Sequence, residues 1–134
     1  MNVAAIMTRD VESITPDTTV GAALDLMDSQ SIRHLPVVQG TTLVGLVSDR
    51  DLAAHVLPLR AAIAHPDEAN GRLETPVSDL LRDELLTVSS TDPIGKAIDS
   101  MLVFGVGAVP VVDDDALVGI LTTIDVLQAA RDAL

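Results

Sequence analysis

The sequence predicts an α/β protein made of two tandem copies of one unit, and each copy runs strand, helix, strand, strand, helix. The first observation behind this prediction is an internal repeat, because residues 6–54 align with residues 80–128 without a gap. The second is that apolar residues change from helical to strand spacing at matching points of the two copies. The third is a glycine motif near the end of each copy, whose glycines, Gly45 and Gly119, lie 74 positions apart (119 − 45).

The elements of the first copy follow from apolar spacing and from turn residues. In order, we expect a strand at Val11–Thr15, a helix from a Thr18 or Thr19 cap to about Ser29, a hairpin of strands at His34–Gln39 and Thr42–Ser48, and a helix from about Asp49.

The second copy repeats this order at the same spacing. We expect a strand at Glu84–Ser89, a helix capped by Asp92 with Pro93 in its first turn, strands at Ala108–Val112 and Ala116–Leu121 joined at Asp113–Asp115, and a helix from about Thr123 to Ala133.

The segment His55–Thr75 has no counterpart in the repeat. Leu57–Ile63 either extends the preceding helix or forms one of its own, and His65–Arg72 is polar, contains helix breakers and is expected to be a mobile loop. The predicted organisation is therefore a first unit at 1–58, a linker at 59–75 and a second unit at 76–134.

Composition excludes several classes of function. Hydrophobic residues make up 48% of the 134 residues and aromatic residues 1%, so the core must be aliphatic and base stacking on aromatic platforms is not expected. The net charge of −12 argues against nucleic-acid binding, and the lack of cysteine excludes disulfides and thiol catalysis. No apolar run reaches the roughly 18 residues of a membrane span and the start lacks a signal-peptide pattern, so we expect a cytoplasmic protein that does not bind membranes.

Each glycine motif ends in a hydroxyl residue followed three positions later by an aspartate: Ser48 and Asp51 in the first copy, Thr122 and Asp125 in the second. The structural interpretation is that the hydroxyl caps a helix and the carboxylate complements the helix dipole. The functional interpretation is that the carboxylate accepts the two hydroxyls of a vicinal diol, while the hydroxyl and free backbone N–H groups suit a phosphate oxygen.

The motifs resemble those of a tandem pair of cystathionine-β-synthase-type (CBS) domains, also called a Bateman module. The resemblance rests on Leu35–Val38 followed by Leu43–Asp51, and on Val109–Asp113 followed by Gly119–Asp125. It covers nearly the whole chain apart from the unmatched segment. It implies two units packed sheet to sheet with pseudo-twofold symmetry, with two clefts between them.

The family resemblance also implies a function. Such pairs commonly bind adenosine compounds, among them AMP, ADP, ATP, S-adenosylmethionine and NAD-type molecules, and regulate another activity. By the resemblance, Ser48 and Thr122 contact phosphate or ribose, and Asp51 and Asp125 take the ribose hydroxyls. Because the same spacing occurs twice in a family-like frame, we favour ligand binding for these four residues, with capping as a compatible second role.

The two copies differ in basic residues. Arg33 and His34 precede Leu35 in the first copy and Arg50 lies within its motif, whereas the second copy has Gly107, Ala108 and Ile124 there. Related pairs place basic residues before the Leu-Pro-Val, where they meet phosphates, so we expect the first copy to favour phosphorylated ligands. The alternative is that these are solvated charges pairing with acidic residues.

An adenine ring needs an apolar slot with backbone hydrogen bonds. By the resemblance, its candidate walls are Ile14, Thr15, Pro36, Val88, Ser89 and Pro110. The alternative is that these residues are ordinary core positions of strands, and this alternative is strong for Ile14 and Val88. Which cleft each residue serves is left open.

No constellation of catalytic residues stands out. The three histidines are in no recognisable triad setting, and no Gly-rich phosphate loop is present. Three acidic residues in a hairpin turn, as at Asp113–Asp115, more often form a solvated turn than a metal site. We therefore expect no enzyme activity, no catalytic cofactor and no metal. The expected function is that of a free-standing regulatory protein, a homodimer that binds AMP, ADP or ATP and signals to an unidentified partner protein. The alternatives are a structural dimerisation module with vestigial clefts, or a sensor of S-adenosylmethionine or another adenosyl ligand.

Overall fold

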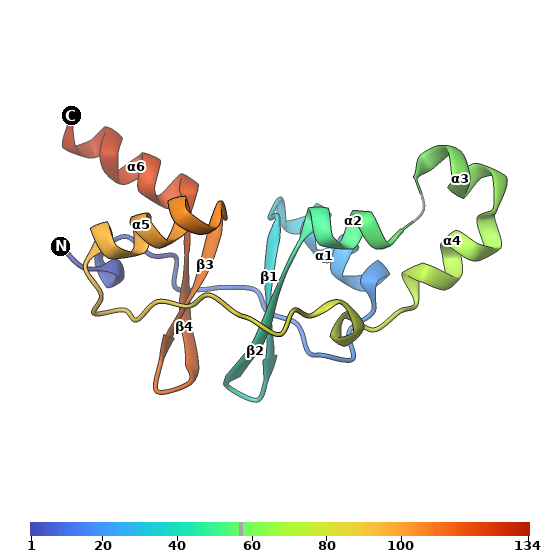
Figure 1. The fold of residues 1–134 in the computed structure, drawn as a ribbon, viewed down its shortest axis with the longest axis horizontal. Helices are drawn as coiled ribbons and strands as arrows, with labels where there is room; N and C mark the ends of the chain where they lie inside the picture. Colours follow the sequence, from blue (N-terminus) through green and yellow to red (C-terminus); the bar gives the residue numbers. More distant parts are fainter. Residues whose placement is uncertain (57) are drawn as a thin grey trace. The chain divides into compact units, whose positions relative to one another are not determined.

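The computed structural model describes residues 1–56 and 58–134 of the chain, and Leu57, which begins one of the predicted helical segments, lies outside the described residues. The described part contains both helices and strands, and each copy follows the predicted order of helix, strand, strand and helix (Figure 1). Its elements are η1 (Val3–Ala5), α1 (Val20–Gln30), β1 (His34–Gln39), β2 (Thr42–Ser48), α2 (Asp49–His55), α3 (Leu59–Ala64), α4 (Pro66–Leu73), η2 (Val77–Leu80), α5 (Ile94–Phe104), β3 (Ala108–Asp113), β4 (Ala116–Thr122) and α6 (Thr123–Ala133).

The chain folds into two compact units, and each unit takes segments from both halves of the sequence. One unit, here called the Ser48 unit, consists of Glu12–Gln39 and Val44–Asp83. The other, here called the Thr122 unit, consists of Met1–Val11, Gly40–Leu43 and Glu84–Leu134. The leading segment of the chain therefore packs with the second copy of the repeat, and the segment before the second copy packs with the first.

The Ser48 unit is built on an aliphatic core between α1, α2 and the β1–β2 hairpin. Thr19 caps α1, since its hydroxyl oxygen accepts a hydrogen bond from the Ala22 amide at 3.1 Å. The buried side chains that form this core are Ile14, Val20, Ala23, Met27, Leu35, Val37, Val47, Leu52 and Val77. Val77 lies in η2, so the segment before the second copy contributes to the core of the first.

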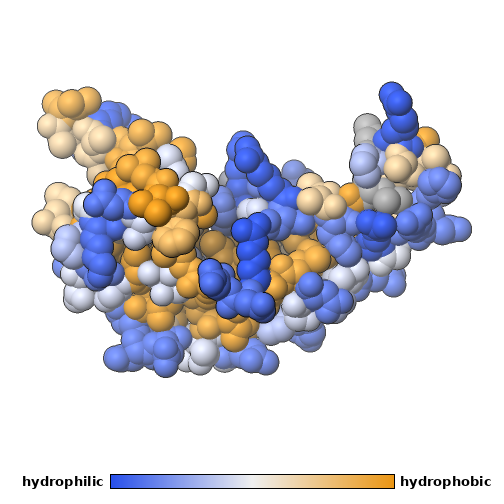
Figure 2. All heavy atoms as spheres, viewed as in Figure 1, coloured by the Kyte–Doolittle hydropathy of each residue, from blue (hydrophilic) through white to orange (hydrophobic). Residues whose placement is uncertain are grey.

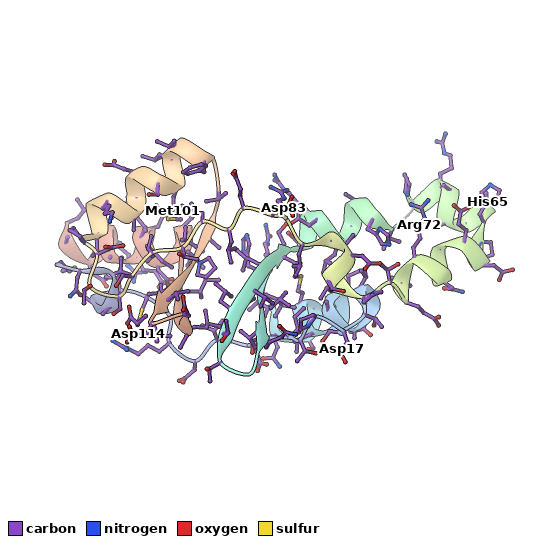
Figure 3. All side chains as sticks on the ribbon, turned by 60° about the horizontal axis from the view of Figure 1, so that its bottom comes forward. Asp17, His65, Arg72, Asp83, Met101 and Asp114 are labelled. Carbon is purple, nitrogen blue, oxygen red and sulfur yellow. The ribbon has the colours of Figure 1, made fainter. Side chains whose placement is uncertain are left out.

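The Thr122 unit has a matching core under α5 and the antiparallel β3–β4 hairpin. The hairpin turn is made by Asp114 and Asp115, which both have left-handed backbone angles (φ 51° and 65°), as a two-residue turn of this hand requires. Figure 3 labels Asp114 at the tip of the hairpin and Met101 on α5. The core side chains are Val3, Met7, Val88, Ala97, Met101, Val109, Val111 and Leu121.

The predicted first strands at Val11–Thr15 and Glu84–Ser89 are wrong. Each segment is extended, but only one residue of each pairs with a neighbour: Ile14 bridges Val37, and Val88 bridges Val111. These two residues are the only ones of their segments whose side chains are buried. Because the flanking positions gain nothing from burial, the pairing does not extend into a ladder.

The predicted mobile loop at His65–Arg72 is also wrong, because this segment forms α4. Pro66 occupies the first helical turn, where its missing N–H costs nothing, and Asp67 and Glu68 complement the helix dipole there. Arg72 pairs with Glu68 at 3.2 Å one turn away. Figure 3 labels His65 and Arg72 on this helical segment.

The predicted Asp92 cap is wrong as well. Pro93 is the residue that precedes the first turn of α5, and it makes no side-chain cap. The Asp92 carboxylate instead accepts a hydrogen bond from the Ser89 amide at 2.9 Å and an ion pair from Lys96 at 3.3 Å. The Asp92 carboxylate therefore stabilises the turn before α5 and does not cap the helix.

Candidate ligand-binding sites

The first candidate site lies where β2 ends and α2 begins. The Asp51 amide donates to the Ser48 hydroxyl at 3.1 Å, and the Ser48 amide donates to Oδ2 of Asp51 at 3.2 Å. The two residues therefore form a reciprocal capping box, in which each side chain satisfies a backbone donor of the other. The predicted capping role is present, and it holds the carboxylate in a fixed orientation at the helix start.

The second copy builds the same arrangement where β4 meets α6. The Asp125 amide donates to the Thr122 hydroxyl at 3.2 Å, and the Thr122 amide donates to Oδ2 of Asp125 at 2.9 Å. The structure thus places one hydroxyl–carboxylate pair in each unit, with the same oxygen of each carboxylate committed to its helix cap. In the second site the Thr122 hydroxyl also donates to Oδ2 of Asp125 at 3.1 Å, and the two sites differ further in the partner of the other oxygen.

The Oδ1 atoms of Asp51 and Asp125 accept hydrogen bonds from two side chains that were not predicted from the sequence. Arg82 donates to Oδ1 of Asp51 at 3.1 Å, and the Thr8 hydroxyl donates to Oδ1 of Asp125 at 3.0 Å. Thr8 and Arg82 are themselves aligned in the repeat, since they lie 74 positions apart (82 − 8). That alignment was the available signal, but only the exchange of leading segments between the units shows which aspartate each residue meets.

The motif glycines let these leading segments approach. A Cβ atom on Gly45 would lie 2.5 Å from Cδ2 of Leu81, and one on Gly119 would lie 2.8 Å from the carbonyl oxygen of Thr8. A glycine in a strand has no side chain and so lets a neighbour approach the backbone closely, and within each unit that neighbour is a segment of the chain itself. The glycines therefore position Arg82 and Thr8 beside the carboxylates.

Arg33, His34 and Arg50 all lie in the Ser48 unit. The carbonyl of Arg33 accepts a hydrogen bond from the Asp49 amide at 2.9 Å, which ties the residue before β1 to the start of α2. The side chain of Arg33 is exposed and lines an open groove of about 390 Å³ together with Leu24, Met27, Asp28, Ser31, Ile32 and Asp49. Arg50 is exposed on the first turn of α2.

His34 is half-buried, and this changes its expected contribution. Burial lowers the pKa of His34 below its ordinary value of 6.5, Asp49 and Asp51 oppose this shift, and Arg33 adds to it. The ring is therefore predominantly neutral near pH 7. His34 can donate or accept a hydrogen bond there, but the positive charge of this unit comes from its arginines.

The predicted adenine walls are divided between the units. Ile14 and Pro36 lie in the Ser48 unit, and the Ile14 amide donates to the Pro36 carbonyl at 3.0 Å. In the Thr122 unit the Val88 amide donates to the Pro110 carbonyl at 3.1 Å. All four side chains are buried, as the core-strand alternative expects, and their contact with a ring stays a prediction.

The two hydroxyl residues among these walls also have partners. The Thr15 hydroxyl bonds the Asp17 carboxylate, and the Ser89 hydroxyl donates to Asp113 at 3.0 Å. Asp113 also accepts from the amide and the hydroxyl of Ser90, and these hydrogen bonds lower its pKa, the Ser90 hydroxyl most. Ser89 is therefore held by an internal network.

Across residues 1–56 and 58–134, no three histidine, aspartate or glutamate side chains gather in a way that could hold a metal ion. In the same described residues, every helix is too short or too polar to cross a membrane.

The family model of the CBS domain matches this chain twice, at residues 3–58 and 77–132. A CBS domain-containing protein of Dictyostelium discoideum is 33% identical over 133 residues, which cover 94% of this chain and 88% of that protein. An inosine-5′-monophosphate dehydrogenase of Methanocaldococcus jannaschii is 31% identical over 95% of this chain, but the match spans only 24% of the enzyme.

Among solved structures, the chain is similar to CBSX2, a CBS-pair protein of Arabidopsis thaliana, in complex with AMP. The two are 31% identical with a TM-score of 0.82, over 98% of this chain and 97% of CBSX2.

Proposed function

Because the chain belongs to the CBS domain family, we propose that it is a regulatory module that binds an adenosine-containing ligand of the AMP, ADP or ATP class. The fold and the repeated motifs are those of CBS-pair proteins, and a relative of similar length was crystallised with AMP. The regulated partner is a protein, and the module itself performs no chemistry.

The observation that carries this proposal is the duplicated hydroxyl–carboxylate pair. Ser48 with Asp51 and Thr122 with Asp125 present a carboxylate fixed by a capping box at a helix start. Each carboxylate oxygen has two lone pairs, so acceptor capacity remains for the two hydroxyls of a ribose after the cap is made. The positive end of the helix dipole favours a phosphate close by.

Titration calorimetry with AMP, adenosine and GMP tests the proposal. We expect AMP to bind the wild-type protein more tightly than GMP, and Asp51→Asn and Asp125→Asn each to weaken binding at one site. Asparagine keeps an oxygen for the cap but loses the charge, so a binding defect is separated from a helix defect. Asp79→Asn is the matched control, because it alters an exposed carboxylate in the first turn of η2. Failure of every adenosine ligand to bind at millimolar concentration would contradict the proposal.

A second function, self-association, is supported by a separate observation. Five exposed large hydrophobic side chains of the Thr122 unit lie on α5 and α6: Leu102, Val103, Phe104, Ile124 and Leu127. Figure 2 shows hydrophobic surface over these two helices. A surface of this kind is typical of a protein–protein contact, and we propose that a second copy covers it to form a homodimer.

A further inference from the structure

We propose that Arg82 and Thr8 set the ligand preference of the two sites, so that the Asp51 site selects phosphorylated nucleosides over free nucleosides more strongly than the Asp125 site. This inference rests on the proposed function and adds the residues that determine its specificity. Neither residue belongs to the glycine motifs, and both reach the carboxylates from segments far away in the sequence.

The two residues occupy equivalent places with different chemistry. Each donates to Oδ1 of its aspartate at nearly the same distance, 3.1 Å for Arg82 and 3.0 Å for Thr8. Arg82 brings a permanent positive charge and five donors, whereas Thr8 brings one neutral hydroxyl that can rotate away. At this position of the repeat, the first copy therefore has threonine and the second copy has arginine.

For a ligand without phosphate, Arg82 is a competitor. Oδ2 of Asp51 already accepts the Ser48 amide, so a ribose that uses both carboxylate oxygens competes with the guanidinium at Oδ1. A charged donor holds a carboxylate more strongly than a neutral hydroxyl does. At Oδ1 of Asp125 the competitor is the neutral Thr8 hydroxyl, which is weaker.

For a phosphorylated ligand, Arg82 becomes a partner. A 5′-phosphate is attached to the same ribose whose hydroxyls the carboxylate holds, so it lies within reach of a long side chain bound to that carboxylate. The Arg82 side chain is 79% exposed and not held by packing, whereas that of Asp51 is 31% exposed. Its fork of donors can contact the phosphate and the carboxylate at once.

The structural alternative is that Arg82 only supports the cap of α2. An exposed ion pair of this kind contributes little to stability. Such a role predicts a small change in melting temperature on mutation and no change in the ratio of AMP to adenosine affinity. The ratio therefore separates the two interpretations.

The test exchanges the two residues. Arg82→Thr is measured by calorimetry in an Asp125→Ala background, which leaves the Asp51 site, and Thr8→Arg in an Asp51→Ala background, which leaves the other. We expect Arg82→Thr to lower the AMP-to-adenosine affinity ratio about tenfold, the effect of losing one charge-assisted hydrogen bond, and Thr8→Arg to raise it by a similar factor. Arg60→Thr is the matched control, because it removes an exposed arginine from α3 of the same unit.

The outcomes distinguish this inference from the proposed function. If the wild-type protein binds AMP but Arg82→Thr, folded by circular dichroism, leaves the ratio within threefold, the inference is overturned and the proposed function stands. If Arg60→Thr lowers the ratio as much as Arg82→Thr does, the effect is one of net charge and the inference is again overturned. If the wild-type protein binds no adenosine compound, the proposed function itself fails and the inference with it.

Discussion

At the scale of single residues, His34 links stability to pH. Its folded pKa lies below the ordinary value of 6.5, so the unfolded state binds the proton more tightly than the folded state. Stability is therefore fully present above about pH 6.5 and is lost as pH falls from there towards the folded pKa. We expect His34→Gln to flatten this part of the profile, measured by urea unfolding between about pH 5 and pH 8.

His65→Gln is the matched control for this experiment, because His65 is an exposed histidine of the same unit. An unchanged slope in His34→Gln would show that the burial of the ring does not govern its protonation. The experiment also tests whether His34 is neutral near pH 7, in contrast to the positive charge that its place in the sequence predicts.

The residues of the two motifs could be predicted from sequence because their roles are local. Ser48 and Asp51 are three positions apart, and that spacing alone is enough for a capping box. Arg82 could not be assigned, because it is 31 positions from Asp51 and its contact depends on how the chain folds back. The same reason hides the partner of Asp125, since Thr8 lies 117 positions away.

At the scale of elements, the Asp113 carboxylate holds the end of the extended segment Glu84–Ser89 in place by hydrogen bonds. Asp113, at the end of β3, holds Ser89 and Ser90 by their hydroxyls and the Ser90 amide. Its pKa lies below the ordinary 3.8, so this stabilisation is present above about pH 3.8 and is lost as pH falls through the folded pKa. We expect Asp113→Ala to lower the melting temperature near pH 7 and to speed hydrogen exchange at the Ser90 amide.

The difference between Asp113→Ala and the wild-type protein should shrink in acid, where the wild-type carboxylate is also protonated. Asp132→Ala, which changes an exposed carboxylate near the end of α6, is the control. A pH-independent difference would mean that Asp113 acts through packing rather than through its charge.

The elements with regular apolar spacing and clear turn residues could be predicted, and the others could not. The helices with an apolar stripe and the two hairpins, such as β3–β4, were found because their spacing and turn residues repeat. The segments around Ile14 and Val88 were predicted to be full strands, but only one residue of each pairs with a neighbour. Residues with a high strand propensity do not show how many of them find a pairing partner. α4 was missed because His65–Arg72 combines breakers with charge, and Pro66 in this case starts a helix instead of ending one.

At the scale of the whole molecule, the apolar surface on α5 and α6 predicts the oligomeric state. A second copy covering it gives a mass of about 28 kDa, twice the 14.0 kDa of one chain. We expect the double substitution of Leu102 and Phe104 by serine to yield a monomer in sedimentation experiments at tens of micromolar, since these side chains are 75% and 62% exposed. Ile63→Ser, at a residue that is 74% exposed in the Ser48 unit, should leave the dimer intact.

A wild-type protein that sediments as a monomer would contradict this prediction directly. The equivalent positions of the first copy are occupied by Asp28 and Gln30, so the sequence could have indicated which copy has the proposed association surface. The exchange of leading segments was beyond sequence reasoning, because the repeat defines which residues are equivalent and not which unit they join. The predicted boundaries at 58 and 76 stay a prediction.

The exchange of leading segments also sets an order for folding during synthesis. The Ser48 unit uses no residue beyond Asp83, so all of it has been made while the ribosome is still adding the second copy. The segment Met1–Val11 is made before the Ser48 unit, yet its partners include Ile120 and Asp125. This segment can pack only after residues 117 positions further along the chain have been made, and until then its apolar side chains stay exposed to water.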